Sequence, residues 1–149
     1  MNKSLLPWTK LVLAVSAVVL CVFGLSWLIA PGFVNSVLWP PPFEPIPALW
    51  LRYDAALYLA MGLGGLYTLL QNDWIGARTY LAITGPYIVM NVLLTLVAAI
   101  TSPGVPPVMW AYVALALLYL PAVVWTWLRE TARARLEERQ VEHGLQPIQ

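Results

Sequence analysis

Four long apolar segments dominate the pattern of hydrophobic and polar positions along this chain. They cover about residues 11–30, 48–70, 79–101 and 108–128. Each is as long as the roughly 20 apolar residues that a membrane-crossing helix needs at about 1.5 Å per residue. The pattern therefore predicts an all-α polytopic membrane protein. We expect one four-transmembrane-helix bundle over residues 1–128 and a charged cytoplasmic tail over residues 129–149.

The composition agrees with this pattern and narrows the range of possible functions. Of the 149 residues, 60% are hydrophobic and only 10% are charged, and the net charge is +1. Short loops and the tail take up nearly all the residues outside the four segments, so no soluble catalytic domain fits. We expect membrane lipid, and no nucleic acid, among the partners of this protein.

The basic residues lie almost entirely on one side of the predicted bundle. Seven of the eight precede the first segment, separate the second from the third, or follow the fourth: Lys3, Lys10, Arg78, Arg129, Arg133, Arg135 and Arg139. The positive-inside rule places that side in the cytoplasm. The loops at 31–47 and 102–107 contain no Lys or Arg, so we expect them outside and both termini in the cytoplasm.

The first external loop, residues 31–47, combines apolar residues with six prolines. Proline lacks the amide donor and restricts the residue before it, so the loop cannot be one uninterrupted helix. We expect a short amphipathic piece around residues 33–39 in the outer interface, followed by an extended proline run across the bundle. Two roles are open for this loop, an interfacial clamp and a lid.

Small residues at spacings of three and four mark faces on which helices approach closely in lipid. The first segment carries such a stripe at Ala14, Ala17, Cys21 and Gly24. In the second segment a stripe is formed by Arg52, Ala56, Ala60 and Gly64. We expect both stripes to pack against neighbouring helices.

Arg52 and Asp54 are the only charged residues that fall clearly within an apolar segment. A charged side chain within a membrane costs free energy, so its presence by default indicates a functional role. Because they are two positions apart, the two side chains point to roughly opposite sides of a regular helix and cannot pair. Arg52 can reach toward the headgroups. Asp54 is either a ligand-binding or proton-binding carboxylate or a hydrogen-bonding strut between helices.

The third segment carries a polar stripe, which consists of Tyr80, Thr84, Tyr87, Asn91 and Thr95. At about 1.5 Å per residue, Thr95 falls near the depth of Asp54, and Asn91 near that of Tyr58. The polar faces of the second and third segments can therefore meet. We predict an outward-biased polar pocket for a ligand, built from Asp54, Tyr58, Tyr87, Asn91 and Thr95, with Trp50 and Arg52 near its mouth.

Aromatic pairs flank the fourth segment, with Trp110 and Tyr112 near its start and Trp125 and Trp127 near its end. Such pairs form belts at the membrane interfaces, so we expect these residues there. The tail that follows mixes Arg and Glu. Along a solvated helical extension, Glu130 can pair with Arg133, or Arg135 can pair with Glu138.

The sequence offers few residues for cofactor chemistry. Cys21 is the only cysteine and His143, in the tail, is the only histidine, which excludes disulfide exchange and a cysteine metal site. Haem between helices is usually held by His or Met. The segments contain Met61, Met90 and Met109, and apolar filling is the usual role of such residues. We expect no metal, no cofactor and no catalytic residues.

The order of these features resembles the small bacterial DoxX-like four-helix membrane proteins. The resemblance rests on a first segment that ends in LIAPGF, a proline-bearing outer loop, the run LRYDAALYLAMGLG, and Arg78 before the third segment. It implies a compact four-helix bundle in a bacterial inner membrane, in some members an accessory subunit of a membrane oxidoreductase. A fainter similarity, at Leu57, Tyr58, Met61 and Gly62, is to tryptophan-rich sensory proteins of the translocator type.

Three classes of function follow. A binding or accessory protein would hold a lipophilic small molecule, lipid-like or quinone-like, in the pocket, and its small-residue faces would contact a larger membrane complex or a homo-oligomer. A membrane-embedded enzyme, such as an isomerase, would need an acid and a base, for which Asp54 and Tyr58 are available. A small transporter would need a more central carboxylate than Asp54. We expect the first class.

Overall fold

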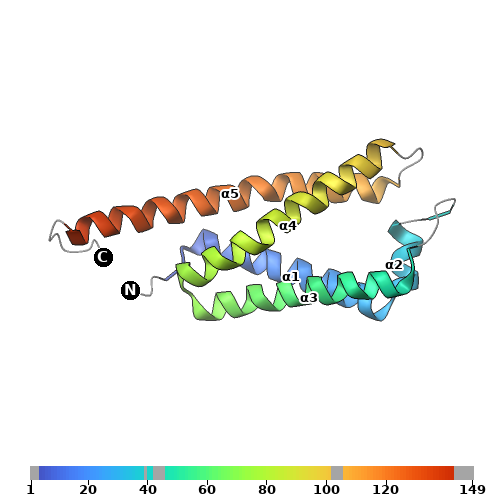
Figure 1. The fold of residues 1–149 in the computed structure, drawn as a ribbon, viewed down its shortest axis with the longest axis horizontal. Coiled ribbons are helices and arrows are strands. Elements are labelled where there is room, and N and C mark those ends of the chain that lie inside the picture. The colour runs from blue at the N-terminus through green and yellow to red at the C-terminus, as the bar shows by residue number, and fades with distance from the viewer. Residues whose placement is uncertain (1–3, 39, 42–45, 102–105, 143–149) are drawn as a thin grey trace.

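The computed structural model describes residues 4–38, 40–41, 46–101 and 106–142 of the chain (Figure 1). These residues form five helices, which are α1 (Pro7–Ile29), α2 (Pro31–Leu38), α3 (Ala48–Gln71), α4 (Trp74–Thr101) and α5 (Pro107–Glu142). The prediction of an all-α protein is confirmed. The short helix predicted around residues 33–39 is α2, whereas most of the expected proline run lies outside the described residues.

Three helices in the described part of the chain are long and apolar enough to cross a membrane. They are α1, the part of α4 from Trp74 to Ala98, and the part of α5 from Pro107 to Glu137. This finding supports the predicted membrane protein. α3 has 24 residues but is more polar, because it carries Arg52 and Asp54. The count of four membrane crossings and the cytoplasmic termini stay predictions.

The four long helices form two antiparallel pairs, α1 with α3 and α4 with α5 (Figure 1). The pairs meet where α1 begins and α3 ends, and they diverge toward the end where α2 follows α1. We call the first the basic end, because it holds Lys10, Arg78, Arg129 and Arg133. The other is called the α2 end.

The contact between α1 and α3 is made at small residues, as the stripe on the first segment predicts. Ala17 and Gly24 of α1 are buried there, as are Gly62 and Gly65 of α3. A Cβ atom built on Gly62 would lie 2.5 Å from Cys21 Sγ and 3.0 Å from the backbone oxygen of Ala17. The two backbones are therefore closer than any side chain on Gly62 would permit.

No helix of the same chain packs against the second stripe at Arg52, Ala56 and Ala60, because all three residues are exposed. α3 instead buries a different face, which includes Ala55, Tyr58, Gly62 and Gly65. Both faces carry small residues at helical spacing. The buried one also carries the ring of Tyr58, which finds aromatic partners on α1.

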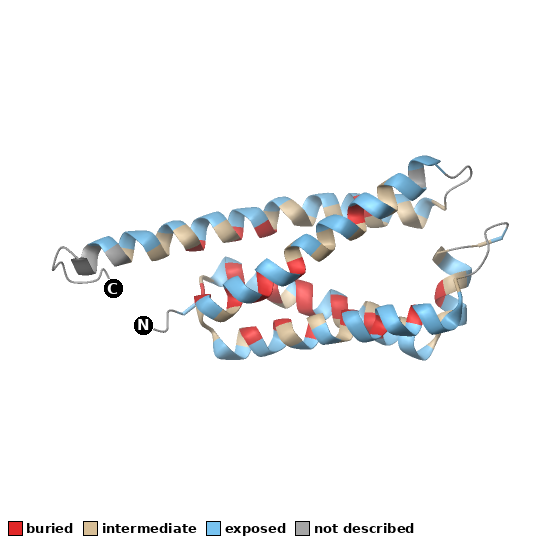
Figure 2. Cartoon of the chain, in the orientation of Figure 1, coloured by how far each residue is buried: buried red, intermediate tan, exposed pale blue. Residues whose placement is uncertain are grey.

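A cluster of buried hydrophobic side chains lies at the basic end and joins α1, α4 and α5. Burial is concentrated on α1, α3 and the first half of α4, whereas α5 is mostly exposed or half-buried (Figure 2). The cluster consists of Leu5, Val12, Leu13, Trp74, Ala77, Tyr80, Leu81 and Val123. The hydroxyl groups of Ser16 and Tyr119 form a hydrogen bond just beyond it, between α1 and α5.

Glu130 fastens α5 to the start of α1. Its side chain is 3% exposed, and Oε1 accepts hydrogen bonds from the Leu6 amide at 3.0 Å and the Thr9 hydroxyl at 2.6 Å. The first amides of a helix have no partner within it and carry partial positive charge, so they stabilise a carboxylate. Arg133 donates to the Ser4 oxygen at 3.2 Å and lies 3.9 Å from Glu130 Oε2. The Glu130–Arg133 pair is confirmed, but the expected solvated position is wrong for Glu130.

We predict that Gly62→Ala lowers the free energy of unfolding by about 1 to 3 kcal/mol, because the added methyl group overpacks the contact between α1 and α3. Unfolding in mixed micelles with increasing dodecyl sulfate, followed by circular dichroism, measures the change. The matched control is Gly85→Ala on α4, whose Cβ would have no neighbouring atom within 4 Å. That variant should be as stable as the parent. Equal losses in both variants would contradict the close contact.

We predict that Glu130→Ala lowers the free energy of unfolding by about 2 to 4 kcal/mol. Hydrogen bonds to a charged group contribute about 1.5 to 3 kcal/mol, and the substitution leaves their donors buried without a partner. The same micelle titration measures it. Glu137→Ala is the control, because the Arg133–Glu137 pair, at 3.1 Å, is partly exposed and its residues are 37% and 26% accessible. Pairs of that kind contribute about 0.5 kcal/mol. A Glu130 variant as stable as the Glu137 variant would show that the enclosed carboxylate does not hold α5 in place.

Candidate functional site

Five aromatic side chains from four helices meet in the half of the bundle nearer α2. They are Phe23 and Trp27 of α1, Tyr58 of α3, Tyr87 of α4 and Tyr112 of α5, and we call them the aromatic cluster. The ring centroids of Trp27 and Tyr58 are 5.0 Å apart, and those of Tyr58 and Tyr87 are 5.9 Å apart, with nearly perpendicular planes. The Phe23 ring lies 6.4 Å from both Tyr58 and Tyr112. Each such pair contributes about 0.5–1.5 kcal/mol beyond burial.

Tyr58 is the centre of the aromatic cluster and has a side chain that is only 7% exposed. Its hydroxyl lies near the hydroxyls of Tyr87 and Tyr112. The Tyr87 hydroxyl in turn lies near the side chain of Asn91. Polar groups that are withdrawn from water need partners of this kind. The cluster therefore encloses a small polar centre made of uncharged hydroxyl and amide groups.

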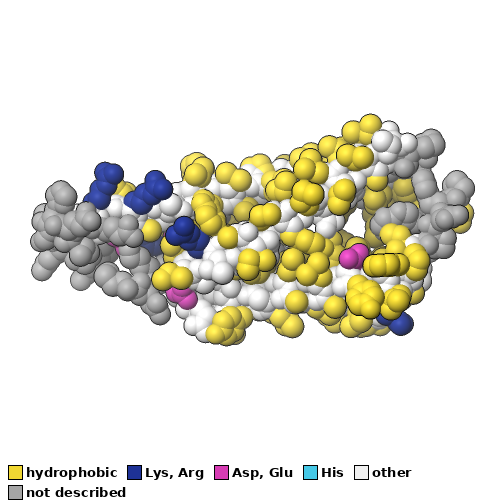
Figure 3. All heavy atoms as spheres, in the orientation of Figure 1, with side chains coloured by type: hydrophobic (Ala, Val, Ile, Leu, Met, Phe, Trp, Pro, Cys, Tyr) yellow, Lys and Arg dark blue, Asp and Glu magenta, His cyan; other side chains and the backbone are white. Residues whose placement is uncertain are grey.

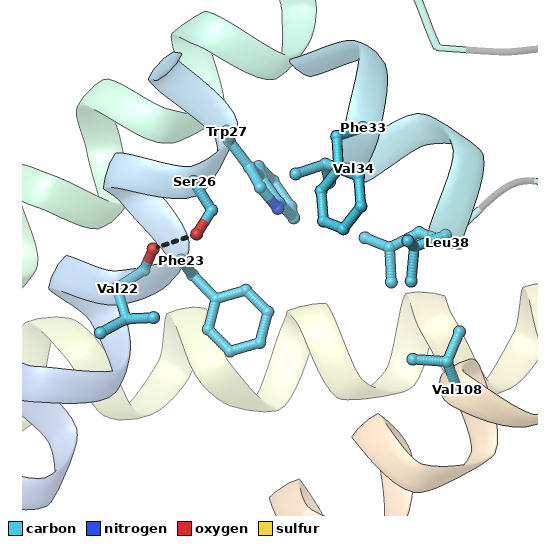
Figure 4. A pocket seen from close by; sticks show the side chains of 9 residues that line it. Val22, Phe23, Ser26, Trp27, Phe33, Val34, Leu38 and Val108 are labelled. Atoms are coloured by element: carbon cyan, nitrogen blue, oxygen red, sulfur yellow. Dashed lines mark hydrogen bonds between the residues drawn. The ribbon is translucent and has the colours of Figure 1, made fainter. Parts of the chain in front are cut away.

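An apolar pocket of about 240 Å³ lies beside the aromatic cluster and shares the rings of Phe23 and Trp27 with it. Side chains of α2 face those of α1 across the pocket, and the start of α5 closes one side (Figure 4). The lining residues are Val22, Phe23, Ser26, Trp27, Phe33, Val34, Val37, Leu38 and Val108. The one hydroxyl among them, on Ser26, donates to the backbone oxygen of Val22 at 2.7 Å. The pocket thus offers apolar contacts, and the polar groups lie behind its aromatic wall.

The structure brings part of the predicted polar pocket together. Tyr58, Tyr87 and Asn91 lie in and beside the aromatic cluster, and Asp54 lies one helical turn before Tyr58 on α3. The Asp54 side chain itself is exposed. Thr95 is half-buried, and its hydroxyl donates to the backbone oxygen of Asn91 at 2.8 Å, which is a bond within α4.

Trp50 and Arg52, which were expected near the mouth of the pocket, both have exposed side chains on α3. Trp50 is 64% accessible, and its ring contacts that of Tyr53 at a centroid distance of 6.2 Å. Neither residue lines the apolar pocket. The binding of a ligand by the seven predicted residues stays a prediction.

Three residues of the site, Phe23, Trp27 and Tyr112, were not predicted as part of it. The Tyr112 ring turns inward to Phe23, and the expected position of this residue at a membrane interface stays a prediction. A signal was present in the sequence. Tyr112, Tyr119 and Thr126 recur at intervals of seven residues, which places them on one face of α5. Phe23 and Trp27 are four residues apart and share a face of α1.

The site carries no cluster of metal ligands. Among the described residues, no three His, Cys, Asp or Glu side chains are close enough together to hold a metal ion. Its functional groups are tyrosine hydroxyls, one amide and aromatic faces. These groups can form hydrogen bonds and enclose an apolar molecule.

The chain was compared with models of protein families, with curated proteins and with solved structures. No match was found in any of the three. The resemblance to the DoxX-like group and the fainter one to the translocator type therefore stay predictions. The chemistry of the aromatic cluster and the pocket is the basis for the function.

Proposed function

We propose that this chain is an integral membrane protein that binds an uncharged lipophilic molecule at the α2 end of its bundle. The proposal rests on one observation. The rings of Phe23 and Trp27 line the apolar pocket and also contact the ring of Tyr58, at the centre of the three tyrosines. In this proposal the apolar part of the ligand lies against α2. Its polar head passes between the rings of Phe23 and Trp27 and exchanges hydrogen bonds with the hydroxyls around Tyr58, which lie behind them.

The size and chemistry of the site favour one class of ligand. Small-molecule pockets usually measure about 300–1,000 Å³, so a pocket of about 240 Å³ suits a single ring or a short length of chain, with the remainder of the molecule in lipid. Uncharged hydroxyls favour a neutral head with a carbonyl or hydroxyl group, since a charged head would need a counter-charge. A quinone-like or neutral lipid-like molecule has these properties.

The proposal includes four membrane crossings. α3 is one of them, although its composition alone does not identify it as a membrane-spanning helix. α3 lies against α1 and runs antiparallel to it (Figure 1). A helix packed along a membrane-spanning helix of almost equal length spans the same depth. Basic side chains gather at the basic end (Figure 3), which the positive-inside rule assigns to the cytoplasm. We therefore place the protein in a bacterial inner membrane, with both termini on its cytoplasmic side.

The proposed role is binding, as a carrier or an accessory subunit, and not catalysis. The isomerase alternative would use Asp54 as its acid or base together with Tyr58. Asp54 is exposed, whereas Tyr58 is enclosed among aromatic rings. A proton-transferring pair needs both groups against the same substrate atoms.

The topology predicts which introduced cysteines react from outside the cell. In a Cys21→Ser background, Gly32→Cys on α2 should react with a membrane-impermeant maleimide in intact cells, because Gly32 is exposed and has open space around it. Gln71→Cys, exposed at the other end of α3, should react only after the membrane is permeabilised. Labelling of both from outside would contradict a membrane-spanning α3.

The site predicts a bound molecule that depends on Tyr58. Native mass spectrometry of protein extracted gently from its own membrane should show a small-molecule adduct, and a benzoquinone with a short alkyl chain serves as a defined probe. Tyr58→Phe should weaken binding of the probe roughly 5- to 30-fold, because it removes a hydrogen bond worth about 1 to 2 kcal/mol. Val37→Trp, which fills the pocket, should abolish binding.

The matched control is Tyr67→Phe, because Tyr67 lies on α3 with a side chain that is 63% exposed, outside the aromatic cluster and the pocket lining. This variant should bind the probe as the parent does. Binding that survives both Tyr58→Phe and Val37→Trp would place any ligand elsewhere. A protein that carries no adduct and does not bind the probe would contradict the proposed function.

A further inference from the structure

The outer face of α3 is bordered by charged side chains. Arg52 lies at one edge of this face and Asp54 at the other; both are exposed, and within the described residues neither forms an ion pair. Among the described long helices, α3 is also the one that is not apolar enough to qualify as a membrane span by composition. Charged side chains that face lipid cost several kcal/mol unless they are paired or reach the headgroups.

A regular seam of residues runs along the same outer face. Its members follow each other at alternating spacings of four and three, which brings them onto one side of the helix. They are Tyr53, Leu57, Ala60, Gly64 and Tyr67, and we call them the α3 seam. Tyr53 and Tyr67 are each 63% exposed and Leu57 is 40% exposed. The buried face of α3, with Gly62 at its centre, points the other way, toward α1.

The two charges flank the α3 seam symmetrically. At 100° per residue, Arg52 lies about 100° to one side of Tyr53 and Asp54 about 100° to the other. If two copies of α3 meet along this seam with a two-fold axis parallel to the helices, each flank brings Arg52 of one copy to the same side as Asp54 of the second. The charges that cannot pair within one helix then pair twice between helices.

We propose that the α3 seam binds a second copy of this chain, as a parallel two-fold dimer in the membrane in which Arg52 of each copy pairs with Asp54 of the other. A second copy fits this face because both signs of charge occur at one level of the same helix, so the surface is complementary to itself. Ala60 and Gly64 allow the close backbone approach that holds helices together in lipid. The charge pairs fix the register and orientation.

This inference rests on the proposed placement of α3 across the membrane and does not depend on the proposed ligand. The two can fail separately. Cysteine labelling at Gly32 and Gln71 reports whether α3 crosses the membrane, and binding of the quinone probe reports the ligand. Cross-linking at the α3 seam reports the dimer.

Disulfide cross-linking of the full chain in its native membrane tests the contact. In a Cys21→Ser background, Ala60→Cys should give a covalent dimer with copper phenanthroline, because cysteines on a two-fold seam come within the Cβ separation of about 4 Å that a disulfide needs. The control is Leu118→Cys on α5, which is 74% exposed and lies at a similar distance from the start of its helix as Ala60 does from the start of α3. We expect at least about tenfold more dimer from Ala60→Cys. Equal yields would overturn the proposal.

Charge reversal tests the pairing itself. Added to Ala60→Cys, Arg52→Asp or Asp54→Arg should lower the yield of dimer several-fold, because each places like charges on both flanks. The double reversal, Arg52→Asp with Asp54→Arg, should restore the yield, as a double-mutant cycle requires for a direct pair. A yield that none of the three variants changes would overturn the proposed Arg52–Asp54 pairing. A double reversal that stays as low as the single variants would do the same.

Discussion

The enclosed carboxylate of Glu130 is the contact on which the arrangement of the helices depends. It accepts hydrogen bonds from the Leu6 amide and the Thr9 hydroxyl, and a carboxylate is tolerated in a closed site only where such donors surround it. The same segment is held to the end of α3, because the Leu5 amide donates to Asn72 Oδ1 at 3.2 Å. The start of α1 therefore joins three helices at one point. α4 and α5 are fixed to the α1–α3 pair at the basic end.

The divergence of the two helix pairs away from this point explains where the candidate site lies. At the basic end the pairs are close, and aliphatic side chains together with Trp74 and Tyr80 fill the interior. Toward α2 the backbones separate (Figure 1), and long side chains such as Tyr58, Tyr87 and Tyr112 reach across. The apolar pocket lies beside these rings, where α2 covers the space between α1 and α5.

The sequence predicts the helices of this protein better than it predicts the faces they bury. Hydropathy and length locate the long helices, and the prolines delimit α2, since these signals are local. The buried face of α3 is not local information, because Ala56 and Gly62 lie on two faces that both carry small residues. Only the partner surface of α1 decides between them. Glu130 has the sequence surroundings of a solvated helix, and its enclosure depends on Leu6, which is 124 positions away. Tyr112 could have been assigned inward from its seven-residue repeat.

The two proposals for this protein meet on α3. The Asp54 side chain is exposed, and one turn further along the helix the Tyr58 side chain is enclosed in the aromatic cluster. In the proposed dimer the carboxylate pairs with Arg52 of the second copy, so that neither charge is left facing lipid. The proposed ligand meets only uncharged hydroxyl groups. The charged and the uncharged polar groups of α3 thus have separate tasks on its two faces.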